Sequence, residues 1–540
     1  MSDRPRAWWV LFLPLFLGVA AAVGFLAGAR LGAPRTVDAG LFSFQRSRPS
    51  DKLDQVMDLI DRNYVDSVQE DKLVDEVLQD MLQKLDPHSY YISAAELRAA
   101  QEPLEGSFMG IGVEFALQRD TIVVISPVEG GPSAKLGIRA GDRIVSADGK
   151  ALAGVHIANE DVMKALRGPA GSKVTIGIVR GREAPFDVEV ERGEIPINSV
   201  TVALLEADGT GYIKLSRFAR TTEEEFLTAA KGLLQQGMKR LVLDLRGNGG
   251  GYLNAATGIC DMLLPAGSRI LYTEGRATPR RDFLAKPGGL LVDLPLAVLI
   301  DEGSASASEI VAGAVQDNDR GTIVGRRSFG KGLVQEHVEL EDHSAVRITT
   351  ARYYTPSGRS IQRPYGQGID YDEEMNERFS HGEQFSADSI HLDSTQRFRT
   401  LKGRTVYGGG GIMPDVFVPA DTAERSAYLN ELFFSGAINQ FAFDLADRKR
   451  EQLKAYPSPE AFVEGYSVGR AQLQDLAKEA ASLGVPMDTR GMERSERLIA
   501  ERLKAGVARN IWGEAGYYRV LLGRDSLYHA ARRSFLGATP

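Results

Sequence analysis

The sequence predicts a layered α/β core that is preceded by a small, mostly β domain and flanked by helical segments. Glycine turns and short β-branched runs predict the β domain over residues 103–194. Strands then alternate with helices over residues 195–420, a pattern typical of a layered α/β core. Helical periodicity without a strand pattern marks residues 50–102 and 421–540.

Size and composition narrow the class of protein. The chain has 540 residues, too many for one ordinary domain of roughly 150 residues. A net charge of −8 without a basic stripe excludes nucleic acid as a partner. A single cysteine, Cys260, excludes an intrachain disulfide framework and a Cys-rich zinc site, and we expect it to be buried in a helix. No motif calls for a metal ion or an organic cofactor.

The N-terminus carries the strongest compositional signal. Residues 7–29 form an uncharged run of 23 residues, which as a helix spans about 35 Å against a bilayer core of about 30 Å. The run predicts a transmembrane signal anchor. Small residues at its end leave a cleavable signal peptide as the alternative. We therefore expect a membrane-anchored, single-pass protein, with the bulk of the chain outside the cytoplasm.

Two amphipathic helices are expected in the segment 50–102, over residues 51–66 and 70–85. The proline of "DPHSYYIS" ends the second helix. Asp86 and His88 in this stretch could bind a metal, but a third ligand is missing, so we interpret them as a structural turn.

The β domain contains a recognisable set of motifs. "GIGVEF", "GPSAKLGIRAGDRI" and "LRGPAGSKVTIGIVR" resemble a PDZ domain of the bacterial protease type. The resemblance implies that a C-terminal peptide adds as a strand while backbone N–H groups hold its carboxylate. The peptide-binding residues would be Met109, Gly110, Ile111, Gly112, Val113 and Arg167. A glycine-rich hairpin without a ligand is the alternative for residues 109–113.

"DLRGNGGG", Asp244 to Gly251, follows a buried strand of the predicted α/β core. Loops at the carboxyl ends of parallel strands are where ligands bind in such sheets. The stretch fails the nucleotide-binding patterns G-x-x-x-x-G-K-[ST] and G-x-G-x-x-G. Its glycines would instead let backbone N–H groups approach a reacting oxygen.

"GSASASEIVAGA" places serines at alternate positions before a helix. Ser306 and Glu309 fit a capping box, in which the serine serves only to begin the helix. The alternative is a nucleophile at a strand–turn–helix junction, where helix N–H groups can stabilise an oxyanion. On local grounds Ser304, Ser306 and Ser308 all remain candidates.

Lys331 stands between two glycines in "SFGKGLVQEHVEL". On the strand expected after it, Lys331 and Gln335 would share a face, so Gln335 could orient the lysine amine. The seven histidines offer no obvious candidate for a base beside these motifs, which makes a Ser–Lys dyad the simplest catalytic pair. Such a base must titrate near pH 7–8 instead of about 10.4, a shift of roughly 4 kcal/mol that requires burial.

The motif series resembles the C-terminal processing (tail-specific) serine proteases. The PDZ motifs, "DLRGNGGG", "SASASEI", "FGKGLVQ", "TPSGRSIQ" and "GGGGIMPDV" follow one another in that family's order. The resemblance implies a crotonase/ClpP-like layered α/β protease core, and it links Arg167 to activation by the bound tail. It also implies a set of site residues: Ser306 as nucleophile, Lys331 as general base, Gln335 as the residue that positions Lys331, and Ala307 with Gly249 or Gly250 as oxyanion donors.

Together with this resemblance, the sequence predicts a membrane-anchored serine endopeptidase that binds apolar free C-termini of protein substrates and cleaves them through an acyl-enzyme. We expect its catalytic part on the periplasmic side of the inner membrane. Two other functions stay open, a non-catalytic PDZ scaffold and a crotonase-like acyl-CoA enzyme. The tail 421–540 carries no chemical motif, and we expect it to pack internally or to form a homo-oligomer.

Overall fold

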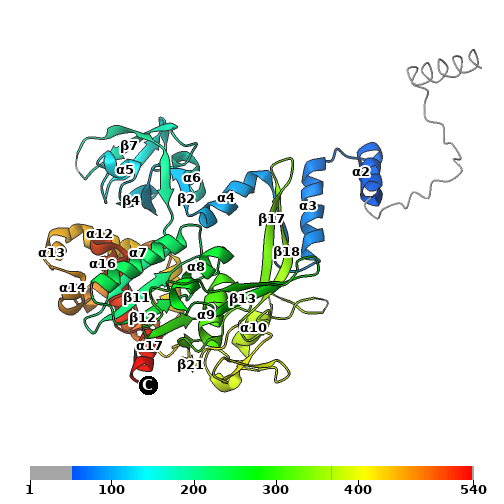
Figure 1. Cartoon of the computed structure of the whole chain (residues 1–540). Coiled ribbons are helices and arrows are strands. Elements are labelled where there is room, and N and C mark those ends of the chain that lie inside the picture. Colours follow the sequence, from blue (N-terminus) through cyan, green and yellow to red (C-terminus); the bar gives the residue numbers. More distant parts are fainter. Residues whose placement is uncertain (1–50, 182, 367, 372, 538–540) are drawn as a thin grey trace, which may run out of the picture. The chain divides into compact units, whose positions relative to one another are not determined.

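The computed structural model describes residues 51–181, 183–366, 368–371 and 373–537, and the chain divides into two compact units after Val74 (Figure 1). The described part of the first unit is helical. It holds α2 (Asp51–Asn63) and the start of α3 (Glu70–Gln83), close to the two ranges expected from periodicity. No residue of α2 is buried.

The expected membrane localisation is wrong on the evidence of the described chain. Among those residues no helix is both long enough and apolar enough to cross a membrane. The longest of them, α16 (Thr489–Leu522), is kinked at Trp512 and Gly513, and charged side chains such as Arg490, Glu501 and Arg519 occur along it. The run 7–29, on which the prediction of an anchor rested, lies outside the described residues. We therefore withdraw the assignment to the periplasmic face of a membrane.

The mostly β domain is an antiparallel sheet with the strand order β3-β4-β5-β7-β8, and β6 pairs with β5. A separate pair, β2 with β9, joins the two ends of the domain. Helix α4 leads into it and ends at Gly106, whose φ of 83° provides a left-handed cap. The elements are α4 (Ala94–Glu105), β2 (Ser107–Gly110), β3 (Val113–Gln118), β4 (Thr121–Pro127), α5 (Pro132–Lys135), β5 (Arg143–Ala147), β6 (Lys150–Ala151), α6 (Asn159–Leu166), β7 (Lys173–Val179), β8 (Phe186–Glu191) and β9 (Gly193–Pro196).

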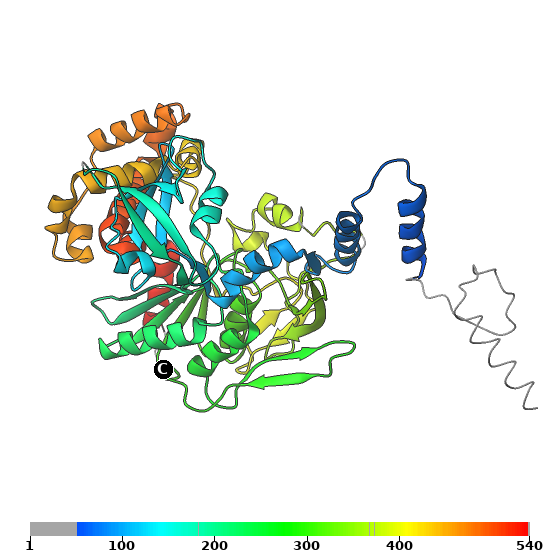
Figure 2. The same ribbon diagram turned by 90° about the horizontal axis from the view of Figure 1, so that it is seen from above.

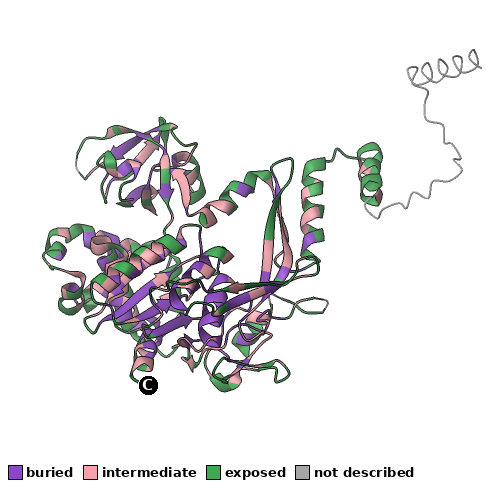
Figure 3. Cartoon of the chain, viewed as in Figure 1, coloured by how far each residue is buried: buried purple, intermediate pink, exposed green. Residues whose placement is uncertain are grey.

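The predicted α/β core is a six-stranded sheet in the order β10-β11-β12-β15-β16-β21. Only the β10–β11 pair is antiparallel. Every residue of β15 is buried, as expected for a parallel strand that is covered on both faces. Figure 3 shows buried residues concentrated in the central sheet. The strands and their connecting helices are β10 (Val200–Leu205), β11 (Thr210–Leu215), α7 (Thr222–Gln235), β12 (Arg240–Asp244), α8 (Leu253–Leu263), β15 (Leu296–Ile300), α9 (Ala307–Asp317), β16 (Thr322–Gly325) and β21 (Val416–Phe417).

Helices cover both faces of this sheet. Side chains of α7, α8 and α9 form one hydrophobic core with it, and Cys260 of α8 is fully buried there, as predicted. The other face packs against Leu527 and Tyr528 of α17 (Ser526–Gly537). Figure 2 shows α17, in red, beside the strands of this sheet. The layered α/β core, with a mostly β domain and helices before and after it, confirms the predicted fold class.

A second, antiparallel sheet contributes to the site. Its strands alternate along the chain with those of the core sheet. Its strands run β1-β18-β13-β14, and β17 pairs with the free side of β18. The elements of this region are β1 (Tyr90–Ile92), β13 (Arg269–Glu274), β14 (Arg281–Leu284), β17 (Leu333–Glu339), β18 (Ala345–Tyr354), α10 (Glu373–Ser380), the short 3₁₀ helix η1 (Ala387–Ser389), β19 (Arg397–Arg399) and β20 (Thr405–Tyr407).

The C-terminal helices form a hydrophobic cluster of their own. Internal packing, one of the two outcomes expected for this segment, is thus present. The helices are α11 (Ala427–Phe434), α12 (Ala437–Arg448), α13 (Arg450–Lys454), α14 (Pro459–Gly465), α15 (Arg470–Ser482) and α16.

Candidate active site

The glycine loop "DLRGNGGG" and the serine segment "GSASASE" meet at the carboxyl ends of β12 and β15. These strands are parallel neighbours, so the loops that follow them leave the sheet at the same edge. The loops are joined through Asn248, whose carbonyl oxygen accepts from Ala305 N at 3.0 Å and from Ser308 Oγ at 2.8 Å. This junction brings the glycine loop against the start of α9.

Ser306 has an unusual backbone conformation at this junction. Its φ is 56° and its ψ is −111°, a region that costs a non-glycine residue about 1–3 kcal/mol. Gly250 packs so tightly here that a Cβ on it would lie 2.8 Å from Ser306 Cβ and 2.9 Å from Ala307 N. The backbone of Ser306 is therefore strained where it faces the glycine loop, as is common at functional sites.

The three candidate serines differ in accessibility. Ser304 and Ser308 are fully buried, and their hydroxyls donate to the carbonyl oxygens of Leu245 and Asn248 at 2.9 and 2.8 Å. Ser306 is half-buried and lines a cavity of about 510 Å³. The geometry favours Ser306 as the hydroxyl that a substrate can reach.

Lys331 lines the same cavity. Its neighbouring glycines are required by packing, because a Cβ on Gly330 would lie 3.0 Å from Gly411 N and one on Gly332 would lie 2.9 Å from Gln362 N. Burial, followed by the positive charge of Arg347, lowers the pKa of the Lys331 amine to about 8. That value lies close to the range that suits a general base near neutral pH.

Gln335 also lines the cavity, but Lys331 and Gln335 do not lie on one regular strand as expected. Strand β17 begins at Leu333, after Lys331, and a β-bulge separates Val334 from Gln335. The extra residue is Thr350 of β18, which the register skips, and both Val334 and Gln335 contribute to the cavity wall. Within the described chain Gln335 Nε2 is buried without a hydrogen-bond partner, so its amide is free to bind another group.

Glu309 connects the two segments that carry Ser306 and Lys331. Its carboxylate is fully buried and accepts from the backbone N–H groups of Ser306 at 2.8 Å, Gly330 at 2.7 Å and Lys331 at 2.9 Å. The Ser328 hydroxyl donates to it as well, at 2.5 Å. Burial nevertheless raises the pKa of Glu309 to about 7. The capping-box glutamate thus also reaches the lysine loop, which sequence spacing could not indicate.

The expected oxyanion donors lie around Ser306. Ala307 is the first residue of α9, where the backbone N–H has no acceptor within the helix. Gly249 and Gly250 line the cavity with Ser306. The N–H of Gly250 already donates to Asn248 Oδ1 at 2.9 Å, whereas Gly249 is exposed.

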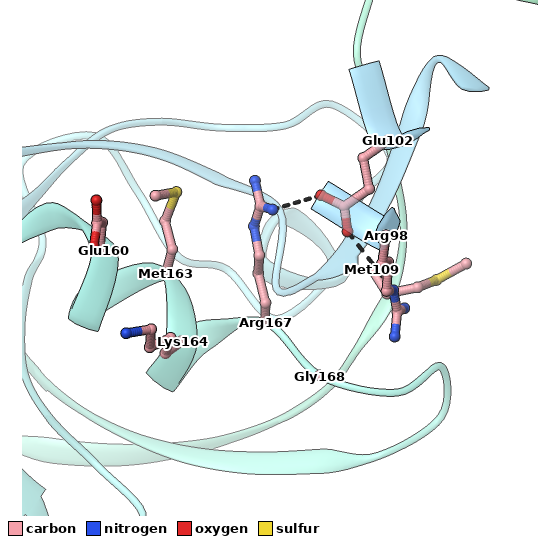
Figure 4. A pocket seen from close by; sticks show the side chains of 8 residues that line it. All are labelled: Arg98, Glu102, Met109, Glu160, Met163, Lys164, Arg167 and Gly168. Carbon is pink, nitrogen blue, oxygen red and sulfur yellow. Dashed lines mark hydrogen bonds and ion pairs between the residues drawn. The ribbon is translucent and has the colours of Figure 1, made fainter. Parts of the chain in front are cut away.

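Arg167 lines a second cavity, of about 410 Å³, between α4 and α6 (Figure 4). Glu102 of α4 forms an ion pair with Arg167 at 2.5 Å and also faces Arg98 at 3.8 Å. The guanidinium of Arg167 lies 4.3 Å from the centre of the Phe108 ring.

The other expected peptide-binding residues are distributed along the start of the β domain. Met109 and Gly110 belong to β2, paired with β9, and the Met109 side chain lines the cavity of Arg167. Ile111 is buried in the domain core, and its carbonyl oxygen accepts from Ser133 N and Oγ. Gly112 turns the chain with a φ of 76°, and Val113 begins β3.

The turn at Asp86 and His88 is closer to the site than its sequence indicated. Asp86 Oδ1 accepts from the backbone N–H groups of His88 and Ser89, which is the structural turn expected. Its negative charge also raises the pKa of Lys331, while burial and Lys331 lower the pKa of His88 to about 4. This long-range charge effect left no signal in the sequence. Within the described ranges no group of three or more His, Cys, Asp or Glu side chains could hold a metal ion.

Comparison with known proteins identifies the family. The profile of "Peptidase family S41" matches residues 209–375, and that of "PDZ domain" matches residues 109–191. Residues 38–95 match "Activating protease CtpB N-terminal domain", and residues 428–513 match a family of unknown function. A carboxy-terminal-processing protease of Bartonella bacilliformis is 36% identical over 437 residues, which cover 79% of this chain and 98% of that protein. The chain belongs to peptidase family S41.

Other relatives of this S41 peptidase carry related names. The carboxy-terminal processing protease CtpB of Bacillus subtilis is 33% identical over 323 residues, 59% of this chain and 67% of that protein. Among solved structures, a photosystem II D1 C-terminal processing protease is 29% identical with a TM-score of 0.35, and the match covers 68% of this chain and 92% of that one. Family membership confirms the resemblance stated above and makes the chain a serine-type peptidase with a PDZ domain, in place of a scaffold or an acyl-CoA enzyme.

Proposed function

We propose that this S41 peptidase cleaves protein substrates with a dyad of Ser306 and Lys331. The observation that carries the proposal is that one cavity is lined by both side chains, while burial lowers the pKa of Lys331 to about 8. A substantial fraction of the amine is then neutral near physiological pH and can accept a proton.

The reaction follows the usual course of acyl transfer. Lys331 Nζ takes the proton of Ser306 Oγ as the oxygen attacks the carbonyl carbon of the scissile peptide bond. The C–N bond breaks, the leaving amine receives that proton from Lys331, and Ser306 holds the acyl group as an ester. Lys331 then takes a proton from water, whose oxygen attacks the ester. The substrate carboxyl group is released and the proton returns to Ser306 Oγ.

Backbone N–H groups stabilise the negative oxygen of each tetrahedral intermediate. Ala307 N–H is available because it begins α9, and the exposed Gly249 supplies a second donor. Gly250 contributes mainly by its close packing against Ser306. Gln335, with its unpaired amide at the cavity wall, orients the lysine amine.

The PDZ domain selects substrates by their free C-termini. The cation of Arg167 suits a terminal carboxylate, and Met109 and Met163 provide apolar contacts in the same cavity. The backbone from Met109 to Val113, at the start of β3, supplies the edge to which a peptide strand adds. Proteins with apolar C-terminal residues are therefore the substrate class.

Ser306→Ala tests the catalytic assignment. We expect it to lower the rate of hydrolysis of a peptide with a free apolar C-terminus by roughly 10³-fold or more. Binding of a tail peptide should be unchanged, because the PDZ cavity does not include Ser306. Ser308→Ala is the matched control, since Ser308 is a buried serine two residues away; loss of its hydrogen bond to Asn248 should lower the rate far less than loss of the Ser306 hydroxyl. Hydrolysis retained by Ser306→Ala would refute the assignment.

A further inference from the structure

One tyrosine bridges the two residues of the proposed dyad. Tyr353 lies on β18 and is 1% exposed. Its hydroxyl is 2.8 Å from the carbonyl oxygen of Lys331 and 3.2 Å from the carbonyl oxygen of Ser306. Ser306 and Lys331 are 25 positions apart in the sequence, and the Tyr353 hydroxyl contacts the backbone of both.

The backbone N–H groups of Ser306 and Lys331 also share one acceptor, the carboxylate of Glu309. Glu309 Oε2 accepts from the N–H of Ser306 at 2.8 Å and from the N–H of Lys331 at 2.9 Å. Each residue of the pair is thus held at its N–H by one buried carboxylate, and their two carbonyl oxygens share the single O–H of one buried phenol, which lies closer to that of Lys331. A general packing role for Tyr353 would not require its hydroxyl to meet both residues.

The lysine needs such support because of its surroundings. Gly330 has a φ of 95° and Gly332 follows directly, so the backbone around Lys331 has little intrinsic preference for one conformation. Ser306 sits on a separate element, at the start of α9. A displacement of about 1 Å between reacting groups can cost a rate of about 10²-fold.

We infer that Tyr353 is a positioning residue, which sets the distance between the Lys331 amine and the Ser306 hydroxyl by holding their two carbonyl groups. The inference rests on the proposed function, since it assumes this dyad. The phenol stays a neutral donor throughout the working pH range, because burial raises the pKa of Tyr353 well above its usual value.

Tyr353→Phe tests the inference, because it removes the hydroxyl and keeps the ring. We expect kcat for a tail-bearing peptide to fall about tenfold, which corresponds to about 1.4 kcal/mol, while KM and tail-peptide affinity stay the same. The midpoint of the acidic limb of kcat/KM should rise, since a less confined amine gains access to water. Tyr354→Phe is the matched control, because its ring stacks on Tyr272 at 4.7 Å instead.

A purely structural role predicts a different result. Activity would then fall only in proportion to the folded fraction, measured by tail-peptide binding and thermal unfolding, and the midpoint of the limb would stay unchanged. Either that result or full kcat in a folded Tyr353→Phe protein overturns the inference.

A second variant keeps the test decisive if Tyr353→Phe does not fold. Glu309→Asp shortens the side chain whose carboxylate binds the N–H groups of Ser306 and Lys331. We expect the same rise in the midpoint of the acidic limb of kcat/KM. An unchanged midpoint would count against joint positioning of Ser306 and Lys331. Failure of the dyad itself is distinguishable, because it would appear as hydrolysis by Ser306→Ala.

Discussion

Lys331 lies among charges that change the pKa of its amine in opposite directions. Burial is the main cause that lowers this pKa to about 8, and the cation of Arg347 adds to it. The carboxylates of Asp86 and Glu309 act against them by stabilising the protonated amine. Because a general base must be neutral, kcat/KM should rise as pH increases through about 8.

Substitution of these charges should move the activity profile in two directions. Arg347→Gln removes a cation that lowers the pKa of Lys331, so the acidic limb of kcat/KM should shift to higher pH. Asp86→Asn removes a carboxylate that raises this pKa, and the limb should shift to lower pH. Profiles of both variants between pH 6 and 10 provide the measurement. Shifts in the same direction would disprove this account of the lysine environment.

The glutamate beside Arg167 offers a residue-scale test of the PDZ site. Glu102→Gln leaves the guanidinium of Arg167 without its ion-pair partner, so a terminal carboxylate no longer has to compete. We expect a tail peptide to bind about threefold more tightly, in line with a partly exposed ion pair. Fluorescence anisotropy measures the affinity. Glu160→Gln is the control, since Glu160 lines the cavity without pairing with Arg167.

At the scale of elements, the site depends on how closely the glycine loop after β12 approaches α9. Gly250 and Gly247 both have positive φ, of 98° and 67°. The space available for a side chain differs between them. A Cβ on Gly250 would lie 2.8 Å from Ala305 O and 2.9 Å from Ala307 N, whereas one on Gly247 would meet nothing within 4 Å. The loop can therefore be tested with two equivalent substitutions.

Gly250→Ala should displace Ser306 and Ala307 and lower kcat by at least about 10²-fold. Gly247→Ala introduces only backbone strain of roughly 1–2 kcal/mol and should keep most of the activity. Single-turnover acylation rates, compared for the two variants at equal folded concentration, check the prediction. Equal rates would mean that close packing against Ser306 is not needed.

Several elements were predictable because their signals are local. A continuous apolar run located β15 and helical periodicity located α9. The choice of Ser306 and Lys331 came from the family resemblance and remains a proposal. The bulge at Val334 and Gln335 was not predictable, since it depends on the pairing of β17 with β18. The charges of Asp86 and Arg347 act on Lys331 through tertiary structure alone, which a motif cannot encode.

At the scale of the whole molecule, the end of the chain is part of the catalytic core. The last helix, α17, covers the second face of the central sheet through residues such as Leu527 and Tyr528. Asp525, just before it, forms an ion pair at 2.7 Å with Arg246 of the glycine loop. Sequence patterns assigned this helix to the preceding helical segment, because an amphipathic face does not reveal what it packs against.

Removal of residues 524–540 should therefore destabilise the core itself. The deletion exposes the apolar face of β12, β15 and β16, so we expect aggregation or loss of a cooperative thermal transition, together with loss of activity. Removal of residues 538–540 alone serves as the control. A shortened protein that unfolds cooperatively with an unchanged Tm would contradict the assignment of α17 to the core.

The most direct test is the pH dependence of Ser306 labelling by a fluorophosphonate probe, in which the serine oxygen attacks phosphorus and fluoride leaves, in the wild-type protein and in Lys331→Ala. We predict a half-maximal labelling rate near pH 8 in the wild type and at most residual labelling in the variant. Labelling that is independent of pH, or equally fast without the lysine, would show that the buried amine is not the base.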